Sequence, residues 1–591
     1  MTTRLDTAFL GPTWVETARR LLRDNGLALT LGAIMVWLVG APIIFLVRMS
    51  FSTGRPANPG HLTLANYSRA FHIEQFMPTL GNTVVYSVGV SLVSMAIAIT
   101  MAWLVERTDM PMRNLVWAVM LLPLAMPGFL SSISYVLLLA PKSGIINQLL
   151  RPMLAPLGFS GDEGPINIYS MYGMIFVEGI RGATTIFLMI VAAFRLMDPS
   201  LEDAAIMSGA GRLETLRTVT IPLLTPALLG ALVYAFVGNL QDFDTPLVLG
   251  LPAGIMILPT LIYFVGYSGA RPNLGVASVY ATLFVVLMVV LTFVYYRYAI
   301  SGSRRFATVL GKGYRPQRIK LGGLRYAALA AVVAFAVLSV ILPFLTLLWT
   351  SVTQGAFQMP TMAALRKADL SAYADLFGSQ SFLRAAWNTI GVSLLAGVAT
   401  MGLAMVSAWA VVRLRVRGAA LLDTLAFIPN AVPSVALGMA LVVFYLGPIG
   451  GLLPIYGTWA LLIIAFVINY VAFATRLSNG AMAQLGPELE EAAWTSGHGK
   501  FSTLVRVTTP LLSPAVVAGM LWIVAHAARN LTLPLMLASQ GTETLSMHLW
   551  NLWDHHTEYT EAAAIGVIMM VAIGGLALFA RSRLSKNADS A

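Results

Sequence analysis

The stretch Glu202-Asp203-Ala204-Ala205-Ile206-Met207-Ser208-Gly209 occurs a second time, 288 positions later, as Glu490-Glu491-Ala492-Ala493-Trp494-Thr495-Ser496-Gly497. Both copies are followed at the same distance by a Pro-Leu-Leu-x-Pro string, which ends at Pro226 and at Pro514. Each copy is polar and lies between long apolar runs, and chance does not produce this arrangement twice. The repeat therefore indicates two halves of common design, each with a polar segment kept out of the membrane.

The composition of the chain excludes a soluble core. Of its 591 residues, 58% are hydrophobic and only 11% are charged, and the mean hydropathy is +0.78. A soluble domain is typically about one quarter charged, so we predict a polytopic membrane protein. The absence of cysteine excludes disulfides and thiolate metal sites. The net charge of +11 comes from basic residues at the ends of apolar runs. This is the positive-inside pattern, and we expect a lipid membrane, not nucleic acid, as partner.

Apolar runs of about 20 residues, the length needed to cross a bilayer, occur about twelve times. In the first half they lie near 29–47, 80–105, 115–140, 170–196, 219–240 and 275–298. In the second half they lie near 325–350, 387–412, 420–446, 457–477, 508–530 and 562–580. We predict an all-α polytopic membrane protein with about twelve transmembrane helices in two pseudo-symmetric halves.

The positive charges then predict which segments are cytoplasmic. They place both polar loops and both chain termini on that side. The predicted parts are an N-terminal tail (1–28), a first half (29–300), a basic linker (301–324), a second half (325–584) and a C-terminal tail (585–591).

The halves repeat beyond the polar loops, at an offset of 306. Asn82-Thr83 matches Asn388-Thr389, and the prolines Pro123 and Pro127 match Pro429 and Pro433. Because the offset later falls to 288, the first half holds 18 extra residues, which we place in the external stretch 141–168. Parallel repeats related by an axis along the membrane normal place a transport path between the halves.

The pattern Asp/Glu-Ala-Ala-x-x-x-Gly of both loops resembles the EAA loop of permease subunits of ATP-binding-cassette importers. The resemblance implies the type I permease fold and a short cytoplasmic helix in each half that docks into a separate ATPase subunit. The docking residues carried over are Glu202, Asp203, Ala204, Ala205 and Gly209, and Glu490, Glu491, Ala492, Ala493 and Gly497. The family's glutamate falls on Glu491 in the second copy but on the shorter Asp203 in the first.

The helices of these loops also carry ordinary helix signals. Acidic residues stand in their first turns, where the helix dipole favours negative charge. Gly209 and Gly497 follow their last turns, and we predict that both take the left-handed conformation that closes a helix.

The resemblance also implies the partners. They are two copies of the cytoplasmic ATPase and a periplasmic or extracellular substrate-binding protein. The chain has no Gly-x-x-x-x-Gly-Lys-Ser/Thr, and Gly497-His498-Gly499-Lys500 supplies only the second half of such a loop. We therefore expect a transport subunit that is not itself an enzyme and binds no cofactor, with ATP and magnesium held by the partner.

Four further segments narrow the resemblance to the fused permeases for ferric iron and 2-aminoethylphosphonate. They are Asn167-Ile168-Tyr169-Ser170, Asp198-Pro199-Ser200-Leu201-Glu202, Asp242-Phe243-Asp244-Thr245-Pro246 and Gly541-Thr542-Glu543-Thr544-Leu545-Ser546. This likeness implies an importer in the bacterial inner membrane. We take ferric iron as the expected substrate, with 2-aminoethylphosphonate or another small solute as the alternative.

Charged residues inside predicted spans are candidates for the transport path, because each costs about 2.5–3.5 kcal/mol or more at a helix centre. They are Glu178, Arg181, Asp242, Asp244 and Arg529, with Asn530 beside the last. Glu178 and Arg181 lie three apart, as an ion pair on one helix would. Arg529 and Asn530 align with Gln241 and Asp242 across the repeat, so lining of the path and pairing between the halves both stay open.

The sequence gives less support to other functions, namely metal binding, catalysis within the membrane and secondary transport. Asp554, His555, His556 and Glu558 resemble a metal cluster, but neighbouring histidines point to different faces of a helix, and we expect no metal site there. A membrane-embedded enzyme would need a nucleophile and base at one depth, and the sequence shows none. A secondary transporter driven by an ion gradient would show paired broken helices and no EAA loop.

Overall fold

The computed structural model describes residues 26–589, apart from 158–160, 198–199, 270, 296, 298–319, 354, 415 and 417. Across these ranges the chain is helical and contains no strand. Nine of the described helices are long and apolar enough to cross a membrane, and three bent helix pairs raise the number to twelve. The predicted all-α polytopic fold is therefore confirmed. The predicted N-terminal tail (apart from 26–28) and most of the basic linker lie outside the described residues.

The first half begins with the span Gly26–Ser50, which includes α2 (Ala41–Ser50). Its other long helices are α4 (Phe76–Arg107), α8 (Met171–Leu196), α11 (Ile221–Leu240) and α13 (Leu274–Tyr295). Shorter helices are α3 (Ala65–His72), α5 (Arg113–Leu121), α6 (Gly128–Leu139), α7 (Ile145–Leu154), α9 (Ser200–Met207), α10 (Arg212–Thr215) and α12 (Leu258–Tyr263).

The second half begins with α15 (Leu324–Ala336) and α16 (Leu342–Val352), which form one span. Its other long helices are α19 (Gln380–Ala408), α22 (Trp459–Gln484), α26 (Ser513–Ala528) and α29 (Tyr559–Asp589). Shorter helices are α17 (Met362–Arg366), α18 (Ser371–Gly378), α20 (Ala419–Phe427), α21 (Ser434–Tyr445), α23 (Glu488–Thr495), α24 (Lys500–Thr503), α25 (Thr509–Leu511), α27 (Thr532–Leu537) and α28 (Leu545–Asn551).

Two predicted spans, 115–140 and 420–446, are not single straight helices. The chain bends by 96° between α5 and α6 and by 104° between α20 and α21. The repeated prolines explain both bends, because the residue before a proline is pushed out of the helical conformation. Met126 and Val432, which precede Pro127 and Pro433, both have extended backbones. A third bend, of 79°, follows α25.

The inner helices of the first two bends form the centre of the molecule. All of α6 and nearly all of α21 are buried. Each packs against the first span of the other half: α2 lies on α21, and α16 lies on α6. Phe45 and Phe444 meet edge to face at 5.1 Å across the first of these contacts. The halves therefore share one interlocked core.

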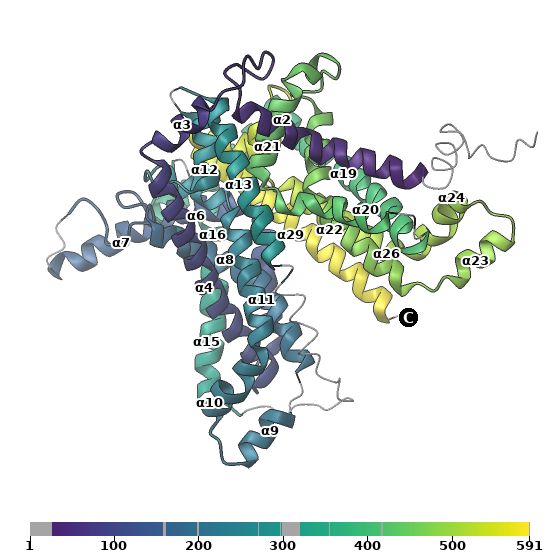
Figure 1. Cartoon of the computed structure of the whole chain (residues 1–591). Helices are drawn as coiled ribbons and strands as arrows, with labels where there is room; N and C mark the ends of the chain where they lie inside the picture. The colour runs from purple at the N-terminus through teal and green to yellow at the C-terminus, as the bar shows by residue number, and fades with distance from the viewer. Residues whose placement is uncertain are drawn as a thin grey trace, which may run out of the picture.

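Two arms of helices extend from this core (Figure 1). One arm, with α4, α8 and α11, ends at α9, and the other, with α19, α22 and α26, ends near α23. Equivalent helices pack in the same way in both arms, since α4 lies on α8 and α19 lies on α22. In the stretch 141–168, where we predicted the extra residues, the first half carries α7, which projects from the body in Figure 1.

Candidate functional sites: two loop helices and a charged cavity

The two polar loops form the short helices α9 and α23, each with acidic residues in its first turn. Both end at a glycine with a positive φ, +92° at Gly209 and +86° at Gly497. After each glycine the next N–H bonds back to a carbonyl five residues earlier, Ala210 to Ala205 and His498 to Ala493. This is the Schellman pattern, and it confirms the predicted left-handed closure of both helices.

A buried ion pair fastens α9 to the end of its arm. Arg107, the last residue of α4, places Nε 2.8 Å from Glu202 Oε2. The other oxygen of Glu202 accepts a hydrogen bond of 2.6 Å from Thr220 Oγ1. Arg107 also donates to the carbonyl of Phe194, near the end of α8. One carboxylate therefore ties α9 to α4 and to the start of the returning span, and its arginine reaches α8.

The second half repeats this anchor residue for residue. Arg413 Nε lies 3.5 Å from Glu490 Oε2, and Thr508 Oγ1 donates to Glu490 Oε1 at 2.6 Å. Arg413 also donates to the carbonyl of Met482, near the end of α22. Glu490 is 1% exposed and Glu202 is 13% exposed. We call Arg107–Glu202–Thr220 and Arg413–Glu490–Thr508 the two loop anchors.

The anchors change the interpretation of the first carboxylate in each loop. Glu202 and Glu490, which the family resemblance places among the docking residues, face helices of this chain itself. Ala204, Glu491 and Ala492 are exposed, while Asp203, Ala205 and Ala493 are half-buried. Their docking role stays a prediction. The sequence analysis missed the arginines and threonines of the anchors, although each pair keeps a repeat offset, 306 for arginine and 288 for threonine.

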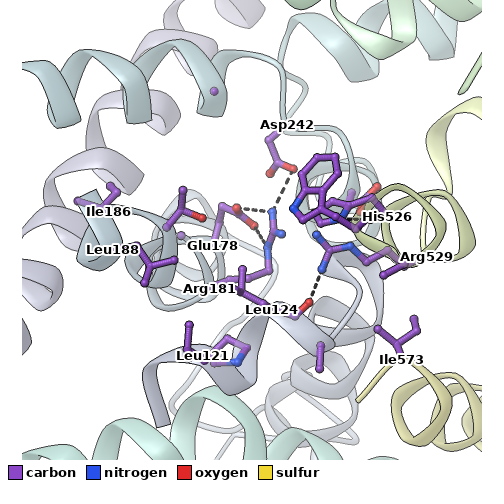
Figure 2. A pocket seen from close by; sticks show the side chains of 18 of the residues that line it. Leu121, Leu124, Glu178, Arg181, Ile186, Leu188, Asp242, His526, Arg529 and Ile573 are labelled. Atoms are coloured by element: carbon purple, nitrogen blue, oxygen red, sulfur yellow. Dashed lines mark hydrogen bonds and ion pairs between the residues drawn. The ribbon is translucent and has the colours of Figure 1, made fainter. Parts of the chain in front are cut away.

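A cavity of about 1120 Å³ lies where the two arms meet, lined by residues of both halves (Figure 2). Five of the predicted path residues line it, namely Glu178, Arg181, Asp242, Asp244 and Arg529. Asn530 is not among its lining residues. Its side-chain oxygen accepts a hydrogen bond from Leu533 N–H at 3.0 Å, at the start of the next helix.

The first half supplies a compact charge network to this cavity. Arg181 forms the predicted ion pair with Glu178, with contacts of 2.8 and 2.5 Å. Its guanidinium also lies 3.9 Å from Asp242, to which Tyr86 donates a hydrogen bond. Thr245 donates to Glu178 at 3.1 Å. Glu178 and Asp242 are therefore each balanced by a cation and a hydroxyl, as buried charges require.

At Asp244 and Gly128, the bend of the first half contacts this charge network. Asp244 lies beside Gly128, the first residue of α6. A Cβ on Gly128 would lie 2.9 Å from the Asp244 carboxylate and 3.3 Å from Cζ of Arg181. Only glycine fits this close approach.

The second half lines the cavity differently. Arg529 donates to the carbonyl of Leu124 at the bend of the first half, which joins the halves (Figure 2). Beside it, the rings of Trp522 and His526 stack at 3.7 Å. The positions equivalent to Glu178, Arg181, Asp242 and Asp244 hold the uncharged residues Phe466, Asn469, Asn530 and Thr532.

Asp554 and His555 form a surface contact. His555 Nδ1 lies 3.3 Å from Asp554 Oδ2, and both side chains are exposed. Among the described residues, no group of three or more His, Asp or Glu is placed to hold a metal ion.

Comparison with known proteins settles the family. A family described as "Binding-protein-dependent transport system inner membrane component" matches residues 94–305 and 400–588, which together are more than half of the chain. The chain belongs to this family. The two matches correspond to the two halves, so this permease carries the family's domain twice.

Several relatives are permeases for iron. The "Ferric transport system permease protein FbpB" of Actinobacillus pleuropneumoniae is 26% identical over 78% of this permease and 64% of that protein. The "Fe(3+)-transport system permease protein FbpB 2" of Haemophilus influenzae is 23% identical over 85% of this permease and 88% of that protein. The match spans less than two thirds of the first of these relatives. A solved bacterial alginate ABC transporter matches 44% of this permease and 92% of its own chain at 19% identity, with a TM-score of 0.36.

Proposed function

We propose that this permease forms the membrane path of an ATP-driven importer of ferric iron in the bacterial inner membrane, with both termini cytoplasmic. The names of its relatives support iron as the solute, because these are ferric transport permeases. The positive charges at the ends of the apolar runs support the orientation.

The duplicated loop anchor is the observation that carries this proposal. Both anchors hold a short helix at the end of an arm with the same three residue types and the same pattern of contacts. A helix of eight residues has little stability of its own, and each anchor holds it in one position. Two copies of one ATPase would each require a docking helix presented in the same way. We therefore infer that α9 and α23 each dock one ATPase subunit, which holds ATP and magnesium.

The cavity is the proposed path for the solute. Its three carboxylates and two arginines give a formal charge of −1, which favours a cation over an anion. Because Arg181, Tyr86 and Thr245 already bind Glu178 and Asp242, these acids are not free to hold a metal ion tightly. A path must bind its cargo weakly enough to release it.

Uptake of radioactive iron into proteoliposomes tests the proposal. The vesicles contain the permease together with a partner ATPase, and a binding protein from the same organism is supplied to the external side. We expect uptake of Fe³⁺ that requires ATP and persists when an ionophore collapses ion gradients. Uptake of 2-aminoethylphosphonate in place of iron would correct the substrate. Uptake driven by a gradient without ATP would overturn the importer itself.

A further inference from the structure

The end of the molecule opposite α9 carries a basic hollow in the first half. This hollow, of about 550 Å³, lies between α3 and the segment that leads into α13. Its polar lining consists of Arg69, His72, Gln75, Arg271 and Asn273. Both arginines are exposed, and neither forms an ion pair with another described residue. Two guanidinium groups around one hollow are a site for carboxylates or other anions.

The equivalent place in the second half lies between α18 and α29. α18 packs on α29 as α3 packs on α13. The tyrosines of the two short helices also make the same contact. Tyr67 OH lies 2.9 Å from Ser50 Oγ, and Tyr373 OH lies 2.8 Å from Ser351 Oγ. The two places are therefore related by the internal repeat.

Their charges are opposite. Asp375 stands at the position of Arg69, at the offset of 306. Glu558 accepts the hydrogen bond from Ala562 N–H at the start of α29, as Asn273 accepts that from Ala277 N–H at the start of α13. α18, which carries Asp375, packs on α29, whose first turn carries Glu561 and which Glu558 directly precedes. Among the described residues, none of these three acids forms an ion pair. Like charges held near each other repel, so each place would gain from a partner of opposite sign.

We propose that these two places form one bipolar docking surface that fixes the orientation of the external binding protein. The part of the binding protein above the first half would present carboxylates to Arg69 and Arg271. The part above the second half would present Lys or Arg to Asp375, Glu558 and Glu561. A binding protein turned by half a revolution would bring like charges together, and such contacts suppress wrong arrangements.

This inference rests on the proposed function, because it requires a binding protein that delivers the solute. A lipid surface is the other candidate partner. It is less suitable, because anionic headgroups that match the arginines would be repelled by the acids of the other half.

The chain contains no cysteine, so single cysteines can report the orientation without background. Ser68 and Ala374 are exposed, and they occupy equivalent positions on α3 and α18. We would cross-link Ser68→Cys and Ala374→Cys to the binding protein that stimulates the reconstituted transporter and map the linked peptides. We expect the two cysteines to be linked to two different parts of the binding protein. Linkage of either cysteine to both parts would overturn the proposal.

Exchanging the charges sharpens the test. Arg69→Asp with Arg271→Glu should raise the binding-protein concentration that half-saturates ATPase stimulation by about tenfold or more, because each charged contact strongly affects association. High salt should reduce this difference. Adding Asp375→Arg and Glu558→Arg should exchange the two linked parts in the cross-linking experiment. The control Lys367→Glu changes an exposed charge of the second half without reversing the polarity, and should leave half-saturation near the wild-type value.

The outcomes separate the two proposals. If the wild-type permease is not stimulated by any binding protein, the proposed function fails. If it is stimulated and the charge reversals change neither half-saturation nor the linked part, only the bipolar surface fails. An effect of the reversals that depends on anionic lipid in the vesicles, and not on the binding protein, would assign the charges to the membrane.

Discussion

The two loop anchors hold α9 and α23 in the same way, with an arginine, a glutamate and a threonine in each half. The walls of the cavity differ, because no charged residue of one half has a charged counterpart in the other. In the loop anchors, each side chain of one half has a chemically identical counterpart in the other. In the cavity, the network around Arg181 faces a wall of aromatic and uncharged side chains, with Arg529 as its cation.

The proposed function accounts for this difference. Two copies of one ATPase would be identical, so the surfaces that receive them would have to stay alike. A solute would cross the cavity once and would impose no such symmetry, so the charges of the path could all belong to one half. We therefore expect variants of the anchors to affect the coupling of ATP hydrolysis to transport, and variants of the cavity to affect the solute. Variants at equivalent positions of the two halves separate these roles.

The largest effect is expected from breaking an anchor. Arg413→Ala leaves Glu490, which is 1% exposed, without its cation. Removal of one partner of a buried pair costs about 3–5 kcal/mol. We expect a large fall in the melting temperature of the purified permease and in its level in the membrane. Arg107→Ala should fall less, because Glu202 is 13% exposed.

The control for this experiment replaces the whole pair. Arg413→Met with Glu490→Leu leaves no buried charge and should recover most of the stability, because apolar side chains of similar size are tolerated where a pair has been removed. A melting temperature of Arg413→Ala equal to that of wild type would contradict the anchor.

The next effect separates the two cavity walls. Arg181→Ala removes the cation shared by Glu178 and Asp242, whereas Asn469→Ala at the equivalent position removes one hydrogen bond with Ser434. A charged carboxylate left inside the membrane without its cation costs about 2.5–3.5 kcal/mol. The loss of one hydrogen bond costs about 0.5–1.5 kcal/mol. Uptake of radioactive iron should therefore fall much further in Arg181→Ala. Equal losses in the two variants would remove the case for unlike walls.

A smaller effect is expected at the glycines that end the loop helices. Gly497→Leu and Gly209→Leu force a side chain into a left-handed conformation, which costs about 1–2 kcal/mol. The space around both Cα atoms is open, so strain and not collision is tested. We expect normal membrane levels but ATP hydrolysis poorly coupled to iron uptake. Gly497→Asn is the control, because asparagine tolerates this conformation. Wild-type uptake by Gly497→Leu would show that the helix end needs no glycine.

Local sequence patterns were enough to predict the helices and the loop closures, because the apolar runs and the repeated loop determine them. The charged residues inside the spans were identified as candidates, but the sequence left open whether they line a path or pair with one another. Glu178 and Arg181 do both, since they form an ion pair and line the cavity. The bends were missed because a hydropathy run continues through them. The Pro-x-x-x-Pro repeat was visible as a marker of symmetry but was not interpreted as a change of direction.

The anchors could not be read from the loops alone. Arg107 and Arg413 look like ordinary positive-inside residues at the ends of spans, and Thr220 and Thr508 look like helix residues. Each glutamate is 18 positions from its threonine, but it is 95 positions from its arginine in the first half and 77 in the second. Only the packing of separate segments brings the three residues together. The common offsets were the one signal that could have found them. Arg529 lines the cavity and Asn530 does not. This difference depends on the direction of the backbone at the end of α26, which the sequence alone does not give.

The smallest effect compares the two loop helices at the acid of the motif, where their sequences differ by one methylene. By family resemblance, the acid of the motif meets a basic residue of the ATPase, and this acid is Glu491 in one loop and Asp203 in the other. A charge-assisted hydrogen bond has an N–O distance of about 2.7–2.9 Å, so a side chain shorter by one methylene does not easily replace glutamate.

Glu202 cannot take over this role, because its two oxygens are already bound to Arg107 and Thr220. Glu491 is exposed, whereas Asp203 is half-buried and already has a contact within the chain. We therefore expect Glu491→Ala to weaken ATPase association and iron uptake more than Asp203→Ala does, at membrane levels matched by blotting. Asp203→Glu should then strengthen association at the first loop, whereas Glu491→Asp should weaken it at the second. A greater loss in Asp203→Ala would show that the shorter acid carries the stronger contact, and the two loops would then differ in the opposite sense.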